Sequence, residues 1–305
     1  MQLIKSTYIN SEHVAGTIRF LRDLLDGMPF PHVHAFAVRD RKLPQDYPHL
    51  RMNGAGKAIL SITSLPQAFD CYWWDRADFA TNARKLSKVQ TRVLEAWPRG
   101  DTLRPSAEVL LDAIRAVLEW GAGGKGLRLY RENARWAEEN VDTLFDRLDR
   151  ARASIEAEEV ADLSVFGRAD GARMNAGFTK FFALGCAGSI IYDGRVGAAL
   201  GLIVRMYCER ERLASVPVEL EFRWGAQVSA GKTQPLPRNP SAGPFAFPAL
   251  NTSDRVWAKW NIQANWILCK ALRGVSAEWC APPDGLRRVE AALFTLGYQV
   301  LPQTL

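Results

Sequence analysis

The sequence predicts a mainly α-helical fold with a few short strands. Apolar residues recur at helical spacing over most of the chain, and only short segments alternate between apolar and polar residues. The 305 residues are 48% hydrophobic and 24% charged, so the chain can bury a core without disulfide bonds or structural metals. We expect two lobes, residues 1–125 and 126–305, with a cleft between them.

The N-terminal lobe is expected to be helical with one short strand. Its first helix follows Ser11, a residue type that caps helices, and stops at Gly27. Residues 31–40 alternate weakly, which indicates a short strand or an extended loop. Further helices are predicted at 76–96 and 106–120, and the apolar run at 56–62 is expected to begin another.

The C-terminal lobe is expected to be helical, with one strand and one long loop. Residues 127–160 are highly charged with one apolar stripe, which predicts a long solvated helix. The segment VPVELEFRW at 216–224 alternates and indicates a strand. Residues 231–250 hold five of the sixteen prolines and predict a loop long enough to suggest a role. The remaining helices are predicted at 196–210, 253–273 and 284–297.

Arginine dominates the positive charge of the chain. Lys and Arg together number 39 against 33 acidic residues, for a net charge of +6, and 29 of these 39 cations are arginines. Arginine binds phosphate bidentately and stacks on flat rings, so nucleic acid is a plausible partner, although a GC-rich genome produces the same bias. Without a long apolar run or a signal-peptide core, we expect a cytoplasmic protein with no membrane partner.

Metal, disulfide and nucleotide sites are not indicated. The five cysteines form no C-x-x-C pair, and all four histidines lie within the first fifty residues. His32 and His34 alternate along the predicted strand but lack a third ligand at a recognisable spacing. The Gly-Lys segments at 53–59 and 121–127 lack the Ser or Thr that follows the lysine of a phosphate-binding loop. We therefore expect no metal and no cofactor.

One segment carries the residues expected to do chemistry. Lys180 is the only lysine between residues 126 and 231, and aromatic residues flank it. A lysine amine desolvated by such neighbours loses its proton more readily and becomes a nucleophile. Thirteen residues later, Asp193 opens the buried helix, where the helix dipole favours a carboxylate. Excision of a base needs an amine that can attack C1′ of the sugar and a carboxylate that stabilises positive charge on it.

These residues also carry a family resemblance. The block TKFF at 179–182 with IYDGRV at 191–196 resembles bacterial 8-oxoguanine DNA glycosylase-like proteins, relatives of the helix-hairpin-helix DNA glycosylases that include phage-defence enzymes. Residues 254–266, DRVWAKWNIQANW, resemble a Trp/Asn signature of the same bacterial group, and Trp120-Gly121 is a weaker similarity. The resemblance implies a helix-hairpin-helix glycosylase-like fold and double-stranded DNA as the partner, with a base flipped out of the duplex. It implies no protein partner.

The resemblance implies roles for residues at matching positions. Lys180 and Asp193 match the catalytic lysine and aspartate. The expected DNA contacts are Arg195, Arg255, Lys259 and Gly177. The candidates for stacking on the flipped base are Phe181, Tyr192, Trp257, Trp260, Phe245 and Phe247. Core packing is the other interpretation of the tryptophans, Trp266 included.

The sequence departs from the usual hairpin. The positions two and four residues before Lys180, usually glycine, are Phe178 and Ala176, and the Lys-to-Asp gap is shorter than in the classical enzymes. These departures favour a hypermodified base such as phages carry, and so an antiviral role, over repair of 8-oxoguanine. Two mechanisms stay open: a Schiff base on Lys180 with strand cleavage, or water directed by Asp193. A non-catalytic protein that binds modified DNA, and an N-glycosidase acting on RNA or nucleotides, are the rival functions.

Overall fold

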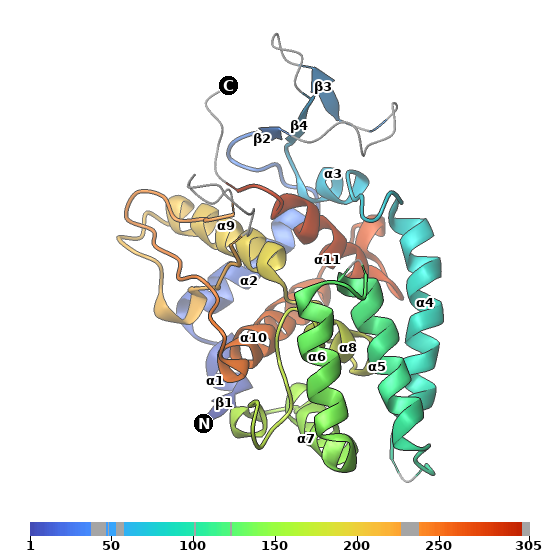
Figure 1. Ribbon diagram of the computed structural model, residues 1–305. Coiled ribbons are helices and arrows are strands. Elements are labelled where there is room, and N and C mark those ends of the chain that lie inside the picture. Colours follow the sequence, from blue (N-terminus) through green and yellow to red (C-terminus); the bar gives the residue numbers. More distant parts are fainter. Residues whose placement is uncertain are drawn as a thin grey trace. The chain divides into compact units, whose positions relative to one another are not determined.

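Helices make up most of the computed structural model, which describes residues 1–37, 47, 49–52, 58–100, 102–122, 124–226 and 238–300 (Figure 1). Within these residues there are eleven α-helices and two small antiparallel sheets. The prediction of a mainly α-helical protein with few short strands is therefore confirmed.

The chain divides into two compact units. Unit 1 comprises Met1–Tyr8, Ala80–Tyr192 and Asn251–Trp266, and unit 2 comprises Ile9–Phe79, Asp193–Leu250 and Ile267–Leu305. The division into lobes 1–125 and 126–305 stays a prediction.

Unit 1 is a cluster of helices with a two-stranded sheet. Its helices are α1 (Lys5–Ile9) for the most part, α4 (Phe79–Ala96), α5 (Ala107–Ala122), α6 (Arg128–Glu139), α7 (Leu144–Ile155), α8 (Phe178–Gly185) and the first part of α10 (Asp254–Leu272). Strands β1 (Gln2–Ile4) and β5 (Val160–Asp162) pair with Leu3 opposite Ala161. Helix α5 packs against α6 and α8 (Figure 1). Its buried residues Leu110, Ile114 and Val117 recur at helical spacing and form one apolar face.

Unit 2 combines helices with a three-stranded sheet. Its helices are α2 (Glu12–Leu25), α3 (Leu65–Asp70), α9 (Gly194–Arg210), α11 (Gly285–Leu296) and the end of α10. Strand β4 (Ala58–Ile62) lies between β2 (His34–Ala37) and β3 (Leu50–Met52), antiparallel to both. Helix α11 packs against α3 and α9, and α2 also packs against α9. Every residue of α9 from Val196 to Cys208 is buried, which confirms the buried helix predicted there.

Three sequence predictions of elements were wrong. Residues 58–62 form a strand rather than a helix, because their apolar run fits the buried centre of a sheet as well as it fits a helix. The long helix expected at 127–160 is broken after Glu139, where Asn140 turns its side chain back to donate to the carbonyl of Trp136 at 2.7 Å. The alternating segment 216–224 contains a short 3-10 helix, Val218–Leu220, in place of a strand.

Two loop predictions fall partly outside the described residues. Residues 53–57 of the Gly-Lys turn and residues 231–237 of the proline-rich loop lie outside the described residues. The rest of that loop contains an isolated bridge between Ala242 and Phe245. Pro240 packs on Gly201 of α9 and accepts a hydrogen bond from Arg205 at 2.7 Å.

Candidate functional site

The side chain of Lys180 is buried within unit 1. It lies on α8, whose eight residues are all buried, and the residue is only 8% exposed. Its Nζ donates a hydrogen bond to the carbonyl of Ala176 at 2.6 Å. The aliphatic chain passes over Gly121 at the end of α5, where a Cβ would lie 2.1 Å from Lys180 Cδ. In this conformation, the lysine leaves room only for glycine at position 121.

Asparagine side chains fix the start of α8. Asn175 Oδ1 accepts the backbone N–H of Gly177 at 2.9 Å and that of Phe178 at 3.1 Å. Asn175 Nδ2 donates to Oδ1 of Asn133, on α6, at 2.8 Å. The N–H of Gly177, predicted to contact phosphate, is therefore already used within the protein. The hydrogen bond between Asn175 and Asn133 connects the start of α8, which carries Lys180, to α6.

Phe181, a predicted base-stacking residue, is part of the core of unit 1. It is fully buried and stacks on Trp97 with ring centroids 5.1 Å apart. Phe178 and Phe182 contact it edge-on from the same helix. This packing in the core of unit 1 accounts for the aromatic residues that flank Lys180 in the sequence.

The asparagines of α10 hold the segment that links α8 to α9. Asn265 Oδ1 accepts the backbone N–H of Ile190 at 3.0 Å, and Asn261 Nδ2 donates to the Ile190 carbonyl at 2.9 Å. Two residues further on, Tyr192 meets Trp257 nearly edge-on, with ring centroids 6.4 Å apart. The Trp/Asn segment thus fixes the backbone just before Asp193.

The tryptophans of α10 are buried in unit 1. Trp257 Nε1 donates to the carbonyl of Asn251 at 2.8 Å, and Trp266 contacts the ring of Tyr8. Trp260 is 3% exposed and lies 4.6 Å from the ammonium of Lys259. Their contacts within unit 1 are those of core residues.

Arg255, a predicted DNA contact that lies in unit 1, is exposed at the start of α10. Its Nε donates to the carbonyl of Phe166 at 3.1 Å. This hydrogen bond uses one of the five donors of its guanidinium. Arg255 therefore keeps donors for a phosphate.

In unit 2, Asp193 caps the N-terminus of α9. Its Oδ1 accepts the backbone N–H of Arg195 at 2.8 Å and of Val196 at 3.0 Å. Gly194 begins the helix against the backbone of Gly225, where a Cβ would lie 2.7 Å from Gly225 Cα. Among the described residues, none donates a hydrogen bond to Asp193 Oδ2. Both cap hydrogen bonds of Asp193 are therefore accepted by one oxygen, Oδ1.

The guanidinium of Arg195 lies among three aromatic rings. Its Cζ is 4.2 Å from the ring centroid of Phe294, 5.2 Å from that of Tyr298 and 5.5 Å from that of Trp74. Burial lowers the pKa of Arg195, and the nearby Asp193 carboxylate opposes this effect. Of the aromatic cluster at 72–74, Trp74 thus contacts a cation that follows the predicted catalytic aspartate.

The charges of this group also act on a second arginine, Arg238, in the proline-rich loop. Burial and the charge of Arg195 lower the pKa of Arg238 to about 10, and Asp193 acts in the opposite sense. Its Nε is buried without a hydrogen-bond partner in the part of the chain that the structure describes. No motif or spacing in the sequence singled out this residue, because its neighbours 235–240 carry only loop signals.

The two phenylalanines of the same loop are buried in unit 2. Phe245 and Phe247 are 7% and 5% exposed. The backbones of Phe245 and Ala242 form hydrogen bonds with each other, and the Phe247 carbonyl accepts a hydrogen bond from Trp224 Nε1 at 2.9 Å. These contacts anchor the loop beside α9.

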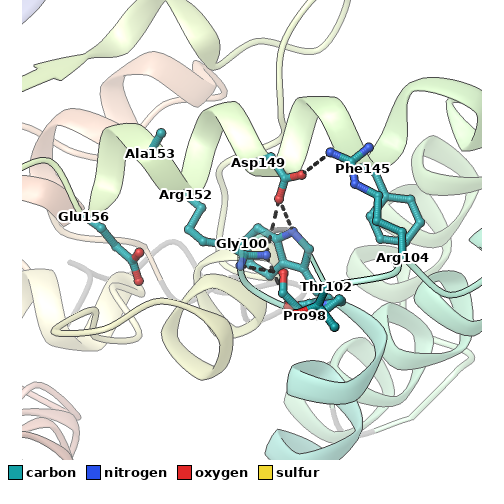
Figure 2. A pocket seen from close by; sticks show the side chains of 10 residues that line it. Pro98, Gly100, Thr102, Arg104, Phe145, Asp149, Arg152, Ala153 and Glu156 are labelled. Atoms are coloured by element: carbon teal, nitrogen blue, oxygen red, sulfur yellow. Dashed lines mark hydrogen bonds and ion pairs between the residues drawn. The ribbon is translucent and has the colours of Figure 1, made fainter.

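A pocket of about 200 Å³ lies in unit 1 beside Trp97 (Figure 2). The carboxylate of Asp149, which lines the pocket, accepts hydrogen bonds from Trp97 Nε1 and Arg104 Nη2, each at 2.7 Å. Arg152 lies over the Trp97 ring, with its Cζ 3.5 Å from the centroid, and donates to backbone carbonyls of residues 97 and 98. Arg104 and Arg152 pair with Asp149, and Glu156 pairs with Arg99 outside the pocket lining. None of the residues that line the pocket is a predicted site residue.

The predicted site residues fall in both units. Unit 1 holds Lys180, Gly177, Phe181, Tyr192, Arg255, Trp257, Lys259 and Trp260, and unit 2 holds Asp193, Arg195 and Phe245. Within unit 1 the structure brings Tyr192 against Trp257, and within unit 2 it brings Arg195 beside Asp193. Sequence reasoning did not identify Gly121 as the residue over which the Lys180 side chain passes. It also did not single out Arg238.

The chain matches no protein-family model, no curated protein and no solved structure. Among the described residues, no helix is long and apolar enough to cross a membrane. No group of three or more His, Cys, Asp or Glu side chains in that part of the chain is placed to bind a metal ion.

Proposed function

We propose that this protein is a cytoplasmic DNA glycosylase with a helix-hairpin-helix glycosylase-like fold. In this proposal it flips a modified base out of double-stranded DNA and cuts the bond between that base and its sugar, leaving an abasic site. The preferred substrate is a hypermodified base of the kind phages carry, which would give the enzyme an antiviral role.

The observation that carries the proposal is the setting of Asp193. This carboxylate caps α9 through one oxygen, and its charge acts on two arginines, Arg195 and Arg238. Loss of a base from a nucleotide develops positive charge on a sugar that lies between two phosphates. A single carboxylate set among cations has the pattern of charge that such a substrate needs.

Lys180 supports the same chemistry. It lies near the start of an apolar helix and is buried, with its amine donating a hydrogen bond to the Ala176 carbonyl. In the Schiff-base route the nitrogen of Lys180 forms a bond to C1′ as the bond from C1′ to the base breaks, and the base leaves with the electron pair and gains a proton. In the hydrolytic route a water oxygen forms that bond instead, with Asp193 directing the water.

The test is to incubate the protein with duplex DNAs that carry different modified bases and to identify released bases by mass spectrometry. Release of a hypermodified base supports the proposal as stated, and release of 8-oxoguanine alone assigns a repair function instead. Release of a base only from RNA or free nucleotides would make the protein an N-glycosidase of another class. If no base leaves any substrate while DNA still binds, the protein is a non-catalytic reader of modified DNA.

Variants separate the two routes. Borohydride reduction should trap a covalent complex between DNA and the wild type but not Lys180→Gln if the Schiff-base route operates. Asp193→Asn should lose base release in either route. Equal base release by Asp193→Asn and the wild type would remove Asp193 from the mechanism.

A further inference from the structure

We propose that the exposed side of α4 binds the phosphate backbone of duplex DNA that flanks the target nucleotide. Three cations form this surface, Arg84, Lys88 and Arg92, which we call the α4 cation row. Taking DNA as the polyanion rests on the proposed function. The row adds an interaction surface on a helix that carries no predicted site residue.

Helix α4 packs on unit 1 through one side (Figure 1). The residues buried on that side are Asn82, Val93 and Ala96. Val93 lies against the end of α8, where a Cβ added to Gly185 would be 3.3 Å from Val93 Cγ1. Gln90 Nε2 donates a hydrogen bond to the carbonyl of Leu184 at 3.3 Å. Helix α4 is therefore fixed to α8, which carries the predicted catalytic lysine.

The cation row is turned away from this packed side. Residues 84, 88 and 92 follow one another at intervals of four, so their side chains line up along the helix, and all three are exposed. Lys88 and Val93 are five residues apart, which separates them by roughly 140° around the helix. With a rise of 1.5 Å per residue, the row is about 12 Å long.

Helix α4 also differs from its neighbours in charge balance. It carries four basic residues against one acid, Glu95, whereas α6 carries three of each and α5 carries one arginine against three acids. Arg84 donates a hydrogen bond to the hydroxyl of Thr81 at 3.1 Å, a contact that leaves its charge uncompensated. Among the residues that the structure describes, none of the three cations of the row forms an ion pair. The positive charge of α4 is thus gathered along one exposed line.

A duplex backbone matches the row in charge and in length. The phosphates of one strand advance by about 3.4 Å along the DNA axis, so a row of about 12 Å spans three to four nucleotides. Contacts to phosphate position a protein on DNA without reading its sequence. Because the row faces away from α8 across the width of a helix, about 10 Å, it would hold flanking nucleotides and not the target itself.

An anionic membrane is the other large polyanion that a basic helix can bind. Helices that bind a membrane surface bury an apolar side among the lipids. The apolar side of α4 is already used within unit 1, where Val93 and Ala96 are at most 1% exposed. DNA requires only the charged side chains, so it is the better match.

The experiment measures DNA affinity at several salt concentrations. Duplex DNA with a stable abasic-site analogue is titrated with the wild type and with two triple variants. The α4 variant combines Arg84→Gln, Lys88→Gln and Arg92→Gln, and the α6 variant, the control, combines Arg128→Gln, Arg131→Gln and Arg135→Gln. The control removes the same charge from exposed positions of a helix whose acids balance it. Glutamine forms helices about as well as arginine and lysine do, and thermal melting verifies that both variants are folded.

We expect the α4 variant to bind DNA roughly 100- to 1,000-fold more weakly than the wild type near 0.1 M salt, because each phosphate contact contributes about 0.9 to the slope of log affinity against log salt. That slope should fall by about three in the α4 variant, and the α6 variant should stay close to the wild type. Equal affinities and slopes in the two variants overturn the inference, as does a wild type that binds no DNA. If vesicles containing phosphatidylserine bind the wild type but not the α4 variant while DNA binding is unchanged, the row binds a membrane and the DNA assignment is wrong.

Failure of the inference and failure of the proposed function are distinguishable. Weakened DNA binding in the α4 variant alone, together with no base release from any DNA by the wild type, leaves the cation row standing and removes the glycosylase. Base release by the wild type with equal DNA binding in the two variants does the reverse.

Discussion

Substitution of Gly121 by alanine should displace Lys180 while leaving the fold intact. A methyl group there would lie 2.1 Å from Lys180 Cδ and 2.7 Å from Cε, whereas ordinary van der Waals contact begins at about 3.4 Å. The lysine chain must therefore move by about 1.3 Å. It can do so because the atoms that clash belong to a flexible side chain and not to backbone.

The cost to stability should be small. Alanine is favoured over glycine within a helix by up to about 1 kcal/mol, and a tight insertion into a core costs about 1–3 kcal/mol. These opposing effects leave the free energy of unfolding within about 2 kcal/mol of the wild type. A shift of roughly 1 Å in a reacting group costs on the order of 100-fold in rate, so the amine should lose most of its reactivity.

Two measurements test this prediction. Borohydride trapping on DNA with an abasic site should fall about 100-fold in Gly121→Ala, and acetylation of Lys180 by a small reagent, followed by peptide mass spectrometry, should change in rate. The control is Gly126→Ala, an exposed glycine of the neighbouring turn with nothing within 4 Å of its Cβ position. If Gly121→Ala and Gly126→Ala behave alike in both measurements, Gly121 does not determine the position of the lysine.

Three further predictions concern stability. Asp193→Ala should lower the free energy of unfolding in urea by about 0.5–2 kcal/mol through loss of the α9 cap, whereas Asp193→Asn, which can still accept both N–H groups, should stay close to the wild type. Gly194→Ala should cost about 1–3 kcal/mol, because its methyl group would lie 2.7 Å from the Gly225 backbone; an unchanged urea midpoint would contradict that contact. Burial, aided by Arg205, lowers the pKa of His34 from 6.5 to about 4. The unfolded chain therefore takes up the proton first, and stability should fall by up to about 3 kcal/mol between pH 6.5 and 4, a loss that His34→Phe should remove.

Helices with strong periodicity could be predicted from the sequence to within a few residues. The helices expected between Ser11 and Gly27, at 196–210 and at 253–273 correspond to α2, α9 and α10. The failures are short apolar or alternating runs, 56–62 and 216–224, where several conformations bury the same side chains and the choice depends on distant partners. The strand at 58–62 exists because β2 and β3 lie on either side of it.

The candidate site was predictable only where its residues are local in sequence. Lys180 and Asp193 stand out because aromatic residues flank the first and a buried helix follows the second. Gly121 and Arg238 could not be found in this way. The packing of α5 on α8 brings Gly121 to the lysine. The electrostatic effect of Arg195 on Arg238 likewise joins residues that lie far apart in the sequence.

The net charge of +6 says little about function until each cation is placed. Much of the arginine excess of unit 1 is cancelled within the protein: Arg104 pairs with two aspartates, and Arg115 pairs with Asp112 and Glu138. Such exposed pairs contribute little to stability and nothing to attraction at a distance. Arg84, Lys88 and Arg92, on the exposed side of α4, form no such ion pair within the described residues. The sensitivity of DNA binding to salt should therefore depend on a few local cations far more than on the total charge of the chain.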